Sequence, residues 1–139
     1  MPRTKLHISQ VDNLASDTRR SSSQVDDILN GSYADLGGMT LSNFPAGKWL
    51  VTFVGVVYLE ADAQATFKIV SNGVDFKETT VSVESQSVGV NASGRLHAVV
   101  TAIVETPGGA DLKIQGVENT GNQVTVLDKE IIATRVNEI

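Results

Sequence analysis

The stretch from Lys48 to Leu59, "KWLVTFVGVVYL", is apolar or small at almost every position. A β-strand points alternate side chains to opposite faces of its sheet, so a strand with one solvated face alternates polar and apolar residues. Here neither set of alternate positions is polar, because Trp49 and Phe53 fall in one set and Leu50 and Val54 in the other. We therefore expect this strand to be covered on both faces.

Two further segments, 96–104 and 124–136, are apolar in both sets of alternate positions. In 124–136, simple alternation places Val126 and Ile132 on one face and Ile131 on the other. A two-layer sandwich buries one face of each sheet and leaves the other in water. If the three segments share a sheet, its outer face is a large apolar patch of a kind that monomers rarely expose. The sequence predicts a partner on that face, most simply copies of the same chain in a closed ring. The alternative is that a loop or the N-terminal arm lies over the sheet.

The chain from Tyr33 onward shows strand patterns separated by turn residues, with no helical crossover between them. Short strands at this spacing predict an all-β fold, an antiparallel β-sandwich or barrel. The expected strands are 38–42, 48–60, 63–72, 76–85, 94–105, 110–119 and 123–136.

The segment before Gly31 is polar with sparse apolar residues at heptad spacing. This spacing predicts a short N-terminal α-helix or coiled coil, with "NG" at 30–31 as its end. It divides the chain into an attachment arm and helical stalk, 1–31, and a β-sandwich head, 32–139. A loosely ordered amphipathic arm and a helix docked on a partner are the alternatives. The heptad positions are Val11, Leu14, Thr18, Ser21, Val25 and Ile28.

Two segments carry a resemblance to a known family. "MTLSNFPAGKWLVTFVGVV" (39–57) and "VTVLDKEIIATRV" (124–136) resemble the entering and closing strands of the TNF-like jelly roll, which complement globular heads share. The resemblance spans about residues 33–137, and many bacteriophage structural proteins carry a variant of this fold. It implies a homotrimer formed through one sheet. Trp49 stands where a tyrosine is commoner, and a collagen-like stalk is lacking, which favours the phage type over the complement type.

The predicted trimer interface combines the heptad with outward positions of two doubly apolar strands. The predicted contact with a virus particle lies at the start of the arm. The interface residues are Val11, Leu14, Val25, Ile28, Leu50, Val54, Val56, Tyr58, His97, Val99 and Ile103, and the attachment residues are Arg3, Lys5, Leu6 and Ile8.

Residues that carry chemistry are scarce. The chain has no cysteine and two histidines, and it lacks paired-histidine, nucleophile-elbow and phosphate-loop motifs. We expect no enzyme activity, no cofactor and no metal. The formal charge of −5 argues against a nucleic-acid partner. No stretch reaches the roughly 20 apolar residues of a membrane helix, so membrane insertion is not expected.

The function predicted from these features is that of a trimeric capsid-decoration or head-fibre protein of a bacteriophage virion, made in the host cytoplasm. Residues 1–30 would hold it to the major capsid protein or another virion protein. The main alternative is a receptor-binding tail-fibre tip that contacts the host cell surface. A cytokine-like ligand is disfavoured because "MPRTKLHISQ" lacks the apolar core of a secretion signal.

Overall fold

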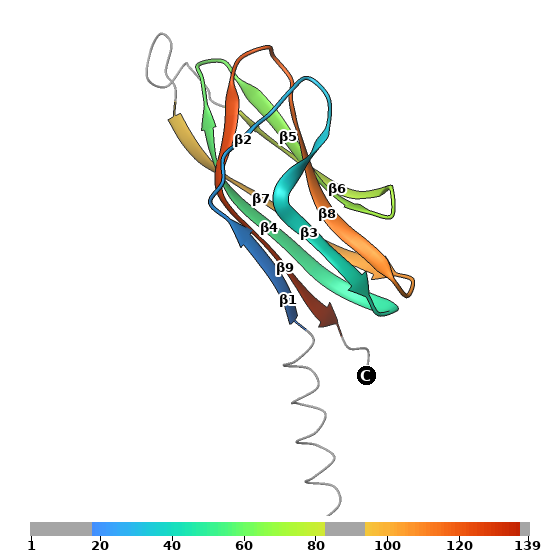
Figure 1. Ribbon diagram of the computed structural model, residues 1–139. Helices are drawn as coiled ribbons and strands as arrows, with labels where there is room; N and C mark the ends of the chain where they lie inside the picture. Colours follow the sequence, from blue (N-terminus) through green and yellow to red (C-terminus); the bar gives the residue numbers. More distant parts are fainter. Residues whose placement is uncertain (1–17, 83–93, 137–139) are drawn as a thin grey trace, which may run out of the picture.

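The computed structural model describes residues 18–82 and 94–136 of the chain. Within these ranges nine β-strands form two antiparallel sheets packed face to face (Figure 1). The strands are β1 (Thr18–Ser23), β2 (Asp27–Ile28), β3 (Ala34–Phe44), β4 (Gly47–Leu59), β5 (Gln64–Ser71), β6 (Val74–Ser82), β7 (Gly94–Thr106), β8 (Ala110–Glu118) and β9 (Val124–Val136).

Sheet A has the strand order β1-β9-β4-β7, with β2 also paired to β9, and sheet B has the order β3-β8-β5-β6 (Figure 1). Strands that are neighbours in a sheet are mostly distant in sequence, since the chain crosses repeatedly between the two layers. The predicted antiparallel sandwich is confirmed, and each of the seven predicted strands corresponds to one of β3 to β9.

The core lies between the two sheets and is built from their inward positions. Phe53 on β4 and Phe67 on β5 meet across it with ring centroids 5.7 Å apart. Phe44 and Trp49 pack edge to face at 4.7 Å near one end. All four side chains are fully buried. Aromatic side chains bury the largest apolar areas, so these rings hold the two layers together.

A β-bulge in β9 changes which residues enter the core. Gly55 of β4 pairs with Lys129, but Val57, two residues on, pairs with Val126, so β9 contains one extra residue there. Because a bulge shifts the alternation by one, Val126 and Ile131 are both fully buried, although plain alternation places them on opposite faces. The assignment of the two faces of β9 from simple alternation was therefore wrong.

The helical stalk predicted to end at Asn30–Gly31 is wrong over its described part. Residues 18–23 form β1 and residues 27–28 form β2, and both strands pair antiparallel with β9. The described sandwich therefore begins at Thr18, before the boundary predicted at residues 31 and 32. The heptad residues Val11 and Leu14 lie outside the described residues.

Side-chain contacts on the inward side of β1 explain why the strand forms. The guanidinium of Arg19 donates to the carbonyl oxygens of Ser42 at 2.9 Å and Asn43 at 3.1 Å, and lies over the Phe44 ring. Ser21 Oγ donates to the Gly38 carbonyl at 2.6 Å. A short helix with polar residues at its seam has little to stabilise it in water, so these tertiary contacts outweigh the heptad pattern.

Gly55 is required at the bulge because the core is closed around it. A Cβ built there lies 2.8 Å from Cζ of the buried Phe53 ring. We expect Gly55→Ala to destabilise the fold by about 1–3 kcal/mol, since the ring must move within a packed core. Urea unfolding measures this change. Gly94→Ala is the control, because nothing lies within 4 Å of a Cβ there. Equal unfolding midpoints for the two variants would contradict the tight packing at Gly55.

Candidate functional site

The outer face of sheet A carries the interface residues predicted on β4 and β7. The two strands pair along their whole length without a register shift. The pairs Leu50–Ile103, Val54–Val99 and Val56–His97 therefore lie side by side on this face, with Tyr58 opposite Arg95 at its end. The structure thus brings the seven predicted residues of these two strands together on one surface.

This outer face is apolar and accessible. The three doubly apolar segments are the neighbouring strands β9, β4 and β7, so they do share a sheet. Val54 is 40% exposed, Val99 47% and Ile103 61%. Within residues 18–82 and 94–136, then, no segment seals these side chains from water. A surface of this kind is typical of an interaction site.

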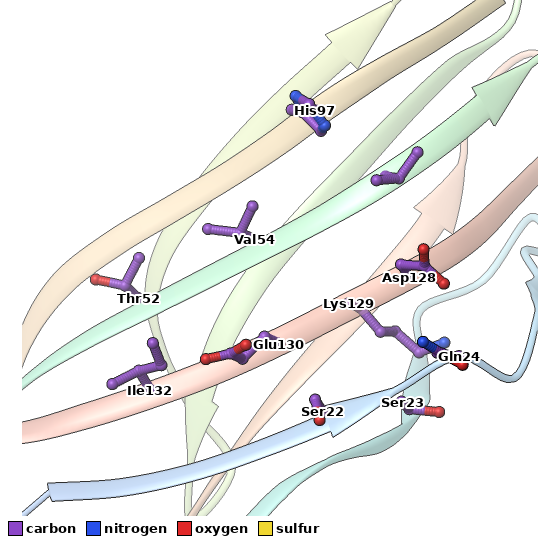
Figure 2. A pocket seen from close by; sticks show the side chains of 11 residues that line it. Ser22, Ser23, Gln24, Thr52, Val54, His97, Asp128, Lys129, Glu130 and Ile132 are labelled. Atoms are coloured by element: carbon purple, nitrogen blue, oxygen red, sulfur yellow. The ribbon is translucent and has the colours of Figure 1, made fainter.

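An open groove of about 570 Å³ runs over part of this face. Its lining includes the apolar side chains of Val54 of β4 and Ile132 of β9 and the carboxylates of Asp128 and Glu130 of β9. Figure 2 shows these side chains on adjacent strands, with Ser22 of β1 on one side and His97 of β7 on the other. Protein–protein contacts likewise combine apolar and polar side chains.

A buried ion pair supports the wall of the groove beside the bulge. The Lys129 side chain is 0% exposed, and its Nζ lies 2.8 Å from Asp27 Oδ2. The same ammonium donates to the carbonyl oxygens of Val25 and Leu127. Asp27 Oδ2 also accepts from the backbone N–H of Gly37 at 3.2 Å. Lys129 thus ties the segment between β1 and β2 to the bulged part of β9.

The outer face of sheet B differs, because ion pairs and hydrogen bonds cover it. A hydrogen bond from Gln115, together with the nearby Lys113 ammonium, holds the pKa of Asp35 below its usual value. Partial burial and the neighbouring carboxylate of Glu78 raise the pKa of Tyr33. This is the charged, solvated surface that an antiparallel sheet normally presents to water.

Two residues predicted to form the trimer interface on a helical stalk, Val25 and Ile28, lie instead in the β-sandwich. Ile28 belongs to β2 and is 65% exposed. It pairs with Thr125, which pairs in turn with Tyr58, so Ile28 joins the outer face of sheet A. Val25 follows β1 and is 73% exposed. Val11, Leu14 and the attachment residues Arg3, Lys5, Leu6 and Ile8 lie outside the described residues.

Sequence patterns missed the part of this face that comes from β1 and β9. Ser22 and Glu130 pair beside Val54, and Arg20 and Ile132 pair beside Thr52. No signal marked β1, because its serines and arginines fit a helical heptad as well as a strand. Ile132 was assigned to the same face as Val126, and only the bulge separates the two.

The described residues contain no group of three or more His, Asp or Glu side chains placed to hold a metal ion. Across the same residues, no helix has the length and apolarity needed to cross a membrane.

No protein-family model and no curated protein matches the chain. Among solved structures, Eiger TNF from S. frugiperda superposes with a TM-score of 0.54. The match covers 88% of this chain and 96% of that chain at 8% sequence identity. The fold is a TNF-like jelly roll. The fold part of the sequence resemblance is thereby confirmed. Identity this low shows the fold alone, since one fold serves many functions.

Proposed function

We propose that this chain is a non-enzymatic structural protein that assembles as a homotrimer and decorates a bacteriophage particle. The observation that carries the proposal is the exposed apolar outer face of sheet A, centred on Val54 and Val99. Association of identical copies removes such a face from water without any further component. The TNF-like fold of the described residues is consistent with this assembly, and the virion role is supported by the sequence resemblance to phage structural proteins.

The proposed mechanism is multivalent attachment. Three arms, each contacting the particle through Arg3, Lys5, Leu6 and Ile8, would raise the overall affinity far above that of one arm. In this proposal the sandwich faces outward and serves mainly to join the three arms.

Because β1 begins at Thr18, an arm deletion that tests the attachment should stop before that residue. Deleting residues 1–17 leaves β1, β2 and the Asp27–Lys129 pair in place, whereas deleting residues 1–30 removes them. We expect the chain without residues 1–17 to remain a folded trimer that no longer binds particles. Binding to particles lacking the protein, measured by co-sedimentation, reports the attachment. A truncated chain that still binds would contradict the role of the arm.

Imaging of intact particles tests where the protein resides. The proposal predicts added density on the capsid surface, lost when the chain is absent. Density confined to the tail end would overturn the decoration role in favour of a receptor-binding tip.

A further inference from the structure

Strand β1 differs from the other strands in what its side chains contribute to the fold. Its sequence, "TRRSSS", contains no apolar residue, and none of its six residues is buried. It lies at the edge of sheet A and pairs with β9 alone (Figure 1). β6, at an edge of sheet B, likewise has no buried residue, but its Val81 packs against the core. Because burial of apolar side chains is the main source of stability, β1 contributes little of it.

Polar contacts hold β1 to the rest of the sandwich. Besides the pairing with β9, Arg19 and Ser21 donate hydrogen bonds to carbonyl oxygens of β3. The Arg19 guanidinium also lies 5.0 Å from the centre of the Phe44 ring. Water can replace each of these donors when β1 leaves, so each hydrogen bond contributes only a small net stabilisation.

The segment that follows β1 is held much more firmly. The Lys129 side chain is 0% exposed, and its ammonium lies 2.8 Å from Asp27 Oδ2 and donates to the carbonyl oxygen of Val25. Leu29 is buried, and its backbone N–H donates to β9 at 3.0 Å. Separating this segment from β9 would leave the buried ammonium without its counter-charge, at a large cost. The boundary between the weakly and the firmly held chain therefore falls at Gln24.

We propose that β1 is a releasable strand: residues 18–23 separate from β9 while the chain from Val25 onward stays folded. Proteins open locally in units that make few buried apolar contacts, and β1 is such a unit, with Gln24 as its hinge. The opening is a property of the described strands themselves, and only its consequence for the arm rests on the proposed function.

Release of β1 removes one side of the groove. Ser22, Ser23 and Gln24 line the groove there, and Figure 2 shows them on the side away from His97. The groove is therefore complete only while β1 is paired with β9. A partner that contacts these three residues favours the paired state, because it loses those contacts in the released one.

Release also lengthens the proposed attachment arm. β1 continues directly into residues 1–17, so its six residues join the arm when the strand leaves β9. Six extended residues span about 20 Å, which increases the distance over which the three arms of one trimer can reach sites on a particle. Attachment at widely spaced sites therefore favours release, and contact at the groove opposes it.

Hydrogen exchange of the full-length chain, followed residue by residue by NMR, tests the release. Because β9 lies between β1 and β4, its N–H groups are divided between the two neighbours. We expect the N–H groups of β9 that bond to β1 to be at least about tenfold less protected than those that bond to β4. They should also respond less to low concentrations of urea, since release exposes little surface.

The two sets of N–H groups belong to one strand, so each is the control for the other. Equal protection and an equal response to urea would show that β1 opens only with the whole fold. That result would overturn the release and leave the proposed function standing. If the unaltered chain failed to bind particles although the first set was weakly protected, the proposed function would fail and the release would stand.

Arg19→Ala provides a second measurement on the same N–H groups. The substitution removes the guanidinium that bonds to β3, so protection of the N–H groups that bond to β1 should fall by about tenfold to a hundredfold. Arg20→Ala is the matched control, because Arg20 carries the same charge, is exposed and points to the other side of β1. Equal losses of protection in the two variants would contradict the assignment of Arg19 as the residue that holds β1 in place.

Discussion

A Val54→Asp chain is expected to be a folded monomer under conditions in which the unaltered chain is a trimer. Val54 lies at the centre of the outer face of sheet A, between Val99 on β7 and Glu130 on β9. In a trimer the new carboxylate is buried without a cation and beside the carboxylate of Glu130. Such a burial costs several kcal/mol at each contact, so the affinity between copies should fall by at least about a hundredfold.

The fold itself should tolerate this substitution, because Val54 is 40% exposed in the single chain and an aspartate there stays in contact with water. Circular dichroism checks the fold, and light scattering reports the mass. Val74→Asp is the matched control: Val74 is 56% exposed on the β5–β6 hairpin of sheet B, so the same chemical change should leave the trimer intact. A Val54→Asp chain that remains trimeric would contradict the assignment of this face. Val99→Asp is expected to act as Val54→Asp does.

An Asp27→Ala chain is expected to lose about 3–5 kcal/mol of its free energy of unfolding. The substitution leaves the fully buried Lys129 ammonium without its counter-charge, with only the carbonyl oxygens of Val25 and Leu127 as partners. A loss of this size is a large fraction of the stability of a typical domain. Urea unfolding monitored by circular dichroism measures the difference.

A double variant distinguishes loss of the ion pair from a general disturbance of the segment between β1 and β2. Asp27→Leu combined with Lys129→Met removes both charges and should recover much of the stability, because neither charge is then left unpaired. Asp26→Ala is the control, since Asp26 is exposed and lies beside Asp27 in the sequence. If Asp27→Ala were no more destabilising than this control, the ion pair would not contribute as we describe.

The strands from β3 to β9 were predictable because local patterns mark them. Their inward residues alternate with polar ones, as Ala65, Phe67 and Ile69 do on β5, and all three are fully buried. Turn residues separate the strands, as Asn72 and Gly73 do at a hairpin where both have positive φ. The excess of apolar residues in β4, β7 and β9 further indicated that a sheet shared by these strands would have an apolar outer face, and the described residues leave that face exposed.

Strand β1, the bulge in β9 and the groove depend on contacts between residues distant in sequence. β1 forms because Arg19 and Ser21 donate hydrogen bonds to carbonyl oxygens of β3, and no local pattern reports such contacts. The bulge in β9 is likewise set by pairing with β4, and it decides that Ile132 joins the outer face. The groove is lined in part by β1 and by the bulged strand β9, so its lining could not be predicted from the sequence.

Sedimentation equilibrium of the full-length chain over a range of concentrations tests the proposed trimer. We expect a particle of three times the 14.8 kDa mass of one chain, dissociating only on dilution. A single species of 14.8 kDa at all concentrations would show that the valines on the outer face of sheet A need no second copy, and would contradict the proposed trimer.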